Sequence, residues 1–202
     1  EVINKLADAS FDYDPISVAC TLELRKHHSG DRQDTWQVLT GSALDKNFIE
    51  SLGQFDYVYS WGVLHHTGAM WDALKNVETL VKPGGIISIA IYNFQPYATR
   101  YWTLVKRVYN KLPWLKPFII AIHTLYPLTP VLILRFISGR KYPRGMSPFY
   151  DLLDWLGGYP FEVAKPEELF SFFKSRNYHL QELRTVGGRM GCNELTFQHN
   201  IA

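Results

Sequence analysis

The sequence has few cysteines and no large excess of charge of either sign. Its only two cysteines, Cys20 and Cys192, are too few for a disulfide scaffold and lack the C-x-x-C spacing of a zinc site. Lys and Arg number 21 and Asp and Glu 19, a net charge of +2, so overall charge gives no reason to expect nucleic-acid binding. With 47% hydrophobic and 20% charged residues, the 202-residue chain has the composition of a folded domain.

The sequence also lacks segments that direct proteins into or across membranes. No basic and then apolar leader follows Glu1, so we expect no signal peptide and a cytoplasmic location. The apolar stretch 117–137 is long enough to cross a bilayer, but two prolines, His123 and Arg135 interrupt it. A cap packed over a pocket, or a helix lying in the membrane interface, fits this stretch better than a spanning helix.

The small net charge conceals an uneven distribution. Residues 93–146 contain nine Lys and Arg and no Asp or Glu, which leaves twelve basic against nineteen acidic residues elsewhere, a balance of −7. We expect a distinct basic cap that meets an anionic substrate or makes peripheral contact with an anionic membrane surface; a solvated basic face explains the pattern equally well. The basic residues are Arg100, Lys106, Arg107, Lys111, Lys116, Arg135, Arg140, Lys141 and Arg144.

Short apolar or β-branched runs alternate along the chain with stretches of helical spacing. This alternation predicts an α/β fold with a doubly wound sheet that is covered by helices on both sides. The run Ile86–Ile91 is nearly all apolar, which is typical of a strand buried on both faces. The predicted helices are 15–28, 70–81 and 166–176, and the predicted strands are 36–39, 55–60, 86–91, 180–186 and 194–198.

Polar residues stand where several of these strands end, and in such a sheet ligands bind beyond the carboxyl ends of the strands. Asp12 occupies one such end, where a carboxylate can accept hydrogen bonds from both hydroxyls of a ribose. Asp14 precedes Pro15, so we expect its side chain to cap the next helix and assign the ribose to Asp12. The other strand ends carry Gly41–Ala43, Ser60–Gly62 and Tyr92–Asn93.

Four motifs follow one another in this part of the chain: FDYDP at Phe11–Pro15, GSALD at Gly41–Asp45, FDYVYSWGVLHH at Phe55–His66 and LVKPGG at Leu80–Gly85. In this order they resemble successive motifs of class I S-adenosylmethionine-dependent methyltransferases. The resemblance is closest to the small-molecule branch that includes quinone-biosynthesis enzymes. It covers residues 10–91 and resumes at 180–198, and the last two motifs at their spacing are its most specific part.

The resemblance implies a Rossmann-like, mostly parallel sheet that ends in an antiparallel strand. It also implies S-adenosylmethionine as cofactor and methyl transfer to a small, partly apolar acceptor. It implies that Asp12 binds the ribose hydroxyls and that Tyr13 lies beside the adenine. Ser42 and Ala43 would border the adenine ring, although many relatives carry Asp where Ser42 stands. Lys82–Gly85 would be the turn before the fifth strand of the family's sheet.

The third motif would supply the methionine end of the site. Ser60 and Trp61 would line the sulfonium, a cation that an aromatic face suits. His65 and His66 are the candidates for a general base, which is needed only if the acceptor must lose a proton, because methyl transfer depends mainly on holding donor and acceptor in line. Either histidine could instead pack as a polar residue at the start of the next helix.

The acceptor side is expected to come from the far half of the chain. We expect no metal, since no His-x-x-x-His zinc pattern occurs. Asp45, Asp56 and Asp72 are expected to be loop and capping acids, and the aromatic residues of the cap to be mainly helix core. The substrate candidates are Tyr92, Asn93, Tyr159, Arg189 and Asn193.

The chain departs from the family at its start. A glycine-rich loop should precede the acid by roughly 20 residues, but only 11 residues precede Asp12, and the first glycine is Gly30. We therefore expect the first strand and its loop to be missing. The expected parts are a truncated cofactor-binding part at 1–92, a helical cap inserted after the fifth strand at 93–160, and a return helix with two strands at 161–202.

Three functions remain open on these observations. The first is S-adenosylmethionine-dependent methyl transfer to a small molecule. The second is a non-catalytic binding module, or pseudoenzyme, that has lost the glycine loop. The third is a nicotinamide-dependent oxidoreductase, which the third and fourth motifs and the two final strands fit less well.

Overall fold

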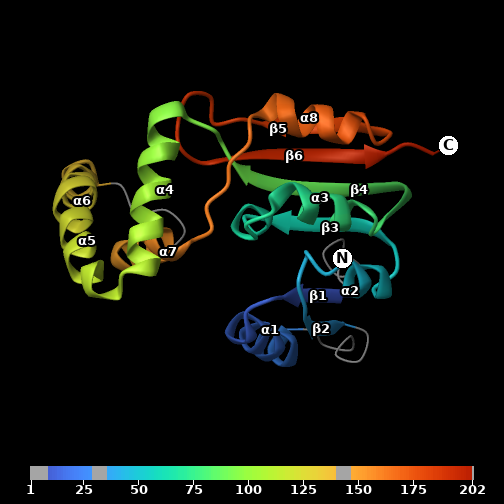
Figure 1. The fold of residues 1–202 in the computed structure, drawn as a ribbon, viewed down its shortest axis with the longest axis horizontal. Coiled ribbons are helices and arrows are strands. Elements are labelled where there is room, and N and C mark those ends of the chain that lie inside the picture. The colour runs from blue at the N-terminus through green and yellow to red at the C-terminus, as the bar shows by residue number, and fades with distance from the viewer. Residues whose placement is uncertain (1–8, 29–35, 140–146, 202) are drawn as a thin grey trace.

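The computed structural model of the chain describes residues 9–28, 36–139 and 147–201 (Figure 1). Three basic residues of the predicted cap, Arg140, Lys141 and Arg144, lie outside these ranges. Within them, strands and helices alternate, a group of helices follows, and the chain returns through one helix to two final strands. The predicted α/β class is confirmed.

The described strands form two sheets instead of one. They are β1 (Ala9–Asp12), β2 (Gln37–Thr40), β3 (Phe55–Trp61), β4 (Val81–Tyr92), β5 (Tyr178–Arg184) and β6 (Cys192–His199). The larger sheet has the order β3-β4-β6-β5, with β3 and β4 parallel and β6 antiparallel to both of its neighbours. The smaller sheet pairs β1 with β2 in parallel. The antiparallel strand expected at the C-terminal end is thus β6, and its pairing with β5 adds a second antiparallel pair.

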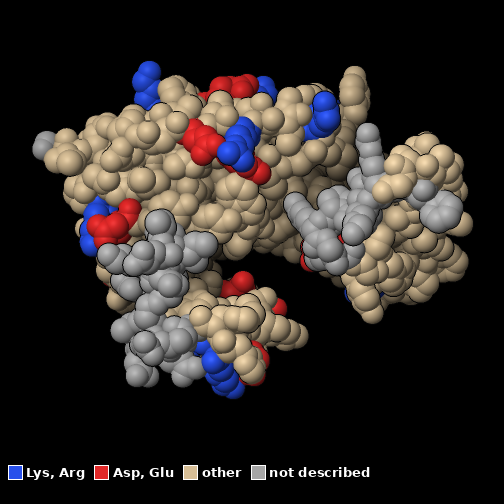
Figure 2. Space-filling model, turned by 180° about the vertical axis from the view of Figure 1, so that it is seen from behind, with Lys and Arg blue, Asp and Glu red and all other residues tan. Residues whose placement is uncertain are grey.

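The sheets are separated where β1 faces β3. Each of these strands has one edge without a strand partner among the described residues. Ser10 and Phe11 of β1 and Tyr57–Trp61 of β3 line one cavity of about 350 Å³ between the two edges. Figure 2 shows the molecule hollowed between the small lobe, which contains β1 and β2, and the main body. The split therefore creates a cavity along the edges of these two strands.

Two aspartates begin helices, as the sequence predicts. Asp14 precedes α1 (Pro15–His28), and its carboxylate accepts hydrogen bonds from the backbone N–H groups of Ile16 and Ser17, both at 3.2 Å. These bonds, with one from the Ser17 hydroxyl, lower the pKa of Asp14. Asp45 caps α2 (Lys46–Ser51) by accepting from the Phe48 N–H at 3.1 Å.

Asp56 was expected to be a loop or capping residue, and it is neither. Asp56 lies within β3 and pairs with Lys82 of β4 at 2.9 Å. The fourth motif also differs from the expected turn, because β4 begins at Val81, directly after α3 (Met70–Glu78) and its C-cap. A side chain at Gly85 would come within 3.1 Å of the Asp56 carbonyl oxygen, so this glycine allows β4 to approach β3 closely.

The helices after β4 form a separate group at one end of the molecule (Figure 1). α4 packs against α5 and α7, and none of the described helices is both long and apolar enough to cross a membrane. Tyr109, Leu152 and Leu156 form a small core of their own between these helices. The elements are α4 (Pro96–Lys111), η4 (Pro113–Leu115), α5 (Lys116–His123), the π-helical turn η5 (Thr124–Leu128), α6 (Thr129–Ile137) and α7 (Pro148–Gly157).

The main core is built from α2, α3, β3, β4, β6 and the return helix α8 (Pro166–Lys174). Phe173 of α8 is fully buried, and its ring stacks on that of Phe197 with centroids 4.4 Å apart. The Tyr178 ring contacts the Phe173 ring edge-on, with centroids 5.3 Å apart. This aromatic cluster fixes α8 against the sheet.

Phe173→Ala should lower the free energy of unfolding by about 3–5 kcal/mol, because it removes a fully buried ring and leaves a cavity. Urea unfolding followed by circular dichroism measures the change. Phe170→Ala, in the same helix but with a side chain 37% exposed, is the matched control and should cost less than half as much. Equal losses in both variants would contradict this account of the core.

Candidate active site

The large cavity brings together three of the six residues expected to bind the cofactor. Ala43, Ser60 and Trp61 line it, together with residues of β1. Tyr13 is 79% exposed and does not line it, and neither does Ser42, whose hydroxyl accepts a hydrogen bond from the Leu44 N–H at 3.1 Å. Of the three residues expected beside the adenine, Ala43 therefore lines the cavity, whereas Tyr13 and Ser42 do not.

Asp12 ends β1, next to the cavity-lining Phe11. Its Oδ1 accepts a hydrogen bond from the Asp14 N–H at 2.8 Å, which fixes the carboxylate in the turn. Its Oδ2 makes no hydrogen bond with any described residue. The Asp12 carbonyl accepts from the Gly41 N–H at 3.0 Å and so ties together the ends of β1 and β2. One carboxylate oxygen thus remains available at the strand end.

His65 is unsuited to act as a base. It lies in η3 (Leu64–His66), is completely buried, and its Nδ1 accepts a hydrogen bond from the Tyr92 N–H at 3.4 Å. Burial, together with the nearby His66 and Lys106, lowers the pKa of His65 to about 3. A neutral ring without access to solvent holds the end of β4; it does not exchange protons with a ligand.

His66 has the geometry that His65 lacks. Its Nδ1 donates to the Pro160 carbonyl at 2.7 Å, which leaves Nε2 with a free lone pair. Nε2 makes no hydrogen bond with a described residue, and the ring is only half-buried. Burial lowers the pKa of His66, so the ring is neutral and able to accept a proton at neutral pH. His66 is therefore the better base candidate of the pair.

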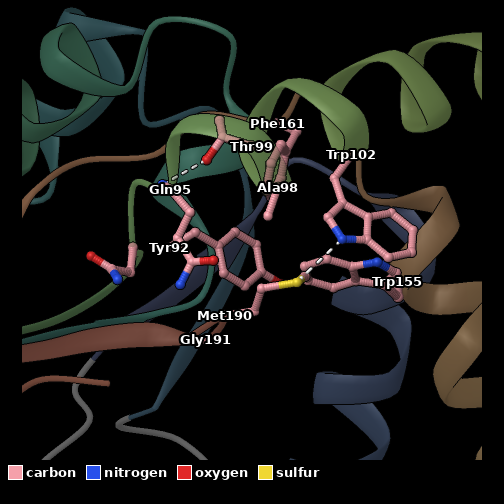
Figure 3. Close-up of a pocket in the computed structure, with 10 residues that line it drawn as sticks. Tyr92, Gln95, Ala98, Thr99, Trp102, Trp155, Phe161, Met190 and Gly191 are labelled. Carbon is pink, nitrogen blue, oxygen red and sulfur yellow. Dashed lines mark hydrogen bonds between the residues drawn. The ribbon is translucent and has the colours of Figure 1, made fainter. Parts of the chain in front are cut away.

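Tyr92 lies at the centre of an aromatic cluster between the sheet and the cap. Its ring centroid is 4.0 Å from that of His65 and 5.3 Å from those of both Trp155 and Phe161. Figure 3 shows a small cavity among these rings, closed by Trp102, whose indole N–H donates to the Met190 sulfur at 3.2 Å. Its volume of about 10 Å³ is room for roughly one water molecule.

The other expected substrate residues divide into two groups. Asn193 is fully buried and donates to the side-chain oxygen of Asn93 at 3.0 Å, while Asn93 donates to the Gly187 carbonyl at 2.8 Å. These amides hold the β5–β6 loop against the end of β4. Arg189 is exposed on that loop, and Tyr159 lies half-buried in the segment that returns from the cap. The structure does not bring these two into the cavity that Tyr92 lines.

Sequence reasoning missed two charged residues that hold this site together. The Glu162 carboxylate accepts from the Met70 N–H at 3.0 and 3.2 Å and so caps α3 from 92 residues away. Lys106 is completely buried, hydrogen-bonds to the Trp155 carbonyl and lies 3.9 Å from the Trp155 ring centroid. Lys106 is four residues after Trp102, on the inward face of α4, and that spacing was the one signal for it in the sequence.

A single glycine lets the returning segment pass over these groups. A side chain at Gly158 would come within 2.8 Å of the His66 ring and 3.4 Å of the Lys106 amine. Burial lowers the pKa of Lys106 to about 8, while Asp154 opposes the shift. The amine and the His66 ring thus share one partly desolvated corner under the cap.

Lys106→Met should reveal this burial through pH. The pKa of Lys106 is about 8 in the folded chain, against 10.5 for an ordinary lysine. Between these pH values the unfolded chain binds more protons than the folded chain, so the free energy of unfolding rises with pH. Over this pH range, the free energy of unfolding of the unsubstituted chain should rise by roughly 3 kcal/mol relative to that of the variant. Urea unfolding at each pH measures the difference. Lys111→Met, exposed on the same helix, should show no such change. Parallel pH curves for Lys106→Met and the unsubstituted chain would contradict the desolvated amine.

Comparison with known proteins agrees with this geometry. Residues 6–87 match the family model described as a methyltransferase domain. A search of curated proteins found no match. An O-methyltransferase family protein from Burkholderia thailandensis superposes with a TM-score of 0.55 at 14% identity, over 98% of this chain and 45% of its own.

Two further solved structures are similar over nearly the whole chain. The [4+2]-cyclase SpnF has a TM-score of 0.55 at 10% identity, over 98% of this chain and 67% of its own. PKMT2 from Rickettsia typhi, in complex with AdoHcy, has a TM-score of 0.53 at 13% identity, over 95% of this chain and 43% of its own. The chain thus spans about half the length of the first structures it matches, and at these identities the likeness shows the fold. Residues 6–87 are thus similar to a methyltransferase domain, and the predicted Rossmann-like fold is confirmed.

Proposed function

We propose that this chain acts in S-adenosylmethionine-dependent methyl transfer to a small, partly apolar acceptor. The observation that carries the proposal is one cavity of about 350 Å³ lined by β1, by β3 up to its carboxyl end and by Ala43 shortly after β2, within the segment that matches the methyltransferase domain. Two similar structures support the cofactor, since PKMT2 was solved with AdoHcy and the trans-methyltransferase CalH with SAH. Ligands bind at this edge of an α/β sheet in general.

The residues around the cavity fit the parts of this cofactor. The free Oδ2 of Asp12 can accept from a ribose hydroxyl at the end of β1. Ala43 offers an apolar wall of the kind that an adenine ring needs, and Ser60 and Trp61 supply a hydroxyl and an aromatic surface at the end of β3. When bound, S-adenosylmethionine supplies a methyl group on a positively charged sulfur. Trp61, 41% exposed and stacked on Tyr59 with centroids 5.5 Å apart, offers its ring to that charge.

The acceptor is proposed to enter from the cap side. η3 connects the two regions, because Leu64 lines the large cavity while His66 meets the segment returning from the cap. Pro160 fixes the His66 ring with Nε2 free, so this nitrogen can take the proton that an oxygen or nitrogen acceptor loses. His65 and Tyr92 hold that corner in place.

The alternative is a binding module without methyl transfer. The unpaired edges of β1 and β3 favour it, since backbone groups at these edges have no strand partner among the described residues. Cofactor binding separates the two readings, because the module would give no heat with S-adenosylhomocysteine. SpnF, described as a cyclase, shows in addition that this fold also occurs in a protein named for a different reaction.

Asp12→Asn should weaken binding of S-adenosylhomocysteine by about ten- to a hundredfold, because a charged acceptor for a sugar hydroxyl is lost. Isothermal titration calorimetry of the full chain measures this. Asp14→Asn, two residues away, is the matched control, since Asn caps α1 as well as Asp does and affinity should not change. Equal affinity of Asp12→Asn and the unsubstituted chain would remove Asp12 from the site.

His66→Gln should lower the rate of methyl transfer about 10²- to 10⁴-fold if the acceptor loses a proton, with S-adenosylhomocysteine affinity unchanged. Transfer of label from methyl-labelled S-adenosylmethionine into a small-molecule extract is the measurement. Because burial lowers the pKa of His66, the rate of the unsubstituted chain should persist below pH 6.5 and fall only at lower pH. His179→Gln, exposed on β5, serves as control. A rate equal to that of the unsubstituted chain would exclude His66 as base.

A further inference from the structure

The helical segment from Lys116 to Ile137 is apolar on two opposite faces. α5, η5 and α6 follow one another without a break and run beside α4. Ile119, Ile120 and Leu128 pack on the core of the cap. The outer face carries a row of large hydrophobic side chains, each more than half exposed, and neighbours in the row are one, three, four or seven residues apart. We call this row the outer cap stripe: Phe118, Ile122, Leu125, Tyr126, Ile133, Leu134 and Ile137.

The stripe has no ordinary explanation within the chain. A helix that is hydrophobic all round is normally buried on all sides, and a soluble surface rarely exposes a continuous apolar strip. From Pro117 to Leu134 the sequence contains no Lys, Arg, Asp or Glu. Figure 2 shows the described surface of this lobe as almost entirely uncharged. The stripe is therefore a surface that needs a covering partner.

Charge at the ends of the stripe indicates what that partner is. Lys111 and Lys116 stand at its start, and residues 93–146 hold eight basic residues besides the buried Lys106 and no acidic residue. The rest of the chain has a balance of −7. An anionic planar surface would thus attract the cap and repel the sheet. Exposed Trp114 and Tyr126 are of the type that gathers at the boundary between lipid headgroups and acyl chains.

Charge argues against a second copy of the chain as the cover. A second copy would bring the basic residues of two caps together, whereas an anionic lipid surface meets them with charge of the opposite sign. An apolar strip with basic flanks is the pattern of a helix that lies in a membrane interface.

We propose that the outer cap stripe docks the protein on an anionic lipid bilayer, with the helix lying in the interface and Lys111 and Lys116 on the headgroups. This inference stands apart from the proposed methyl transfer, since it rests on the cap surface alone. Docking orients the cap toward the membrane and the sheet away from it. Contact with the acyl region comes from the stripe, and the preference for anionic lipid comes from the lysines.

Co-sedimentation of the full chain with vesicles tests the proposal. At low salt the chain should bind vesicles containing about one-third phosphatidylglycerol and bind pure phosphatidylcholine vesicles much more weakly. Ile122→Ser with Leu125→Ser should reduce binding by at least about tenfold, because two exposed apolar side chains leave the interface. Lys111→Gln should reduce binding by about fivefold at low salt and much less at high salt.

Ile16→Ser with Leu24→Ser provides the matched control, since these side chains are exposed by 73% and 55% on α1, far from the cap. Unchanged binding by this variant, with an unchanged thermal melting curve for both double variants, supports the stripe as the docking surface. Three results would overturn it: no binding of the unsubstituted chain to anionic vesicles, equal loss in the control variant, or a dimer in sedimentation velocity that dissociates in Ile122→Ser with Leu125→Ser.

Discussion

The site depends on the position of β4 in the larger sheet. β4 pairs in parallel with β3 and antiparallel with β6, so its backbone is fixed on both edges along most of its length. Its end is fixed as well, because the Tyr92 N–H donates to His65 and the Tyr92 carbonyl accepts from the Ala164 N–H at 2.9 Å. β3, η3 and the segment returning from the cap are thereby held around one residue. The candidate base and the aromatic cluster take their positions from this anchoring.

Two charged residues around the segment that returns from the cap, Glu162 and Lys106, make contacts with residues that are distant in the sequence. The Glu162 carboxylate stabilises the start of α3, where unpaired N–H groups attract negative charge. Burial of Lys106 costs solvation free energy. The hydrogen bond to the Trp155 carbonyl and the contacts with the rings of Trp155 and Phe161 offset part of this cost. A buried amine held in this way ties α4 to α7 within the cap.

The features that the sequence predicted are those set by neighbours along the chain. Helix α1 begins and ends where its spacing and the capping Asp14 indicate, and β3 and the buried part of β4 follow from short apolar runs. Features that depend on distant residues were not predictable in this way. Nothing near Glu162 in the sequence indicates that it caps α3, and the difference between His65 and His66 appears only once burial and the Pro160 carbonyl are known. The histidine pair could therefore be found from sequence, but not divided into two roles.

The two proposals meet in α4. This helix packs against α5, whose outer face carries part of the cap stripe, and its Trp102 closes the small cavity beside Tyr92. A cap docked on lipid would hold α4 at a fixed height above the headgroups and keep the aromatic corner close to the membrane. A partly apolar acceptor that concentrates in the interface would then reach the His66 corner over a short path, whereas the cavity between β1 and β3 would stay on the aqueous side for a charged, water-soluble cofactor. The uneven charge of the chain, basic in the cap and acidic elsewhere, favours this orientation over its reverse.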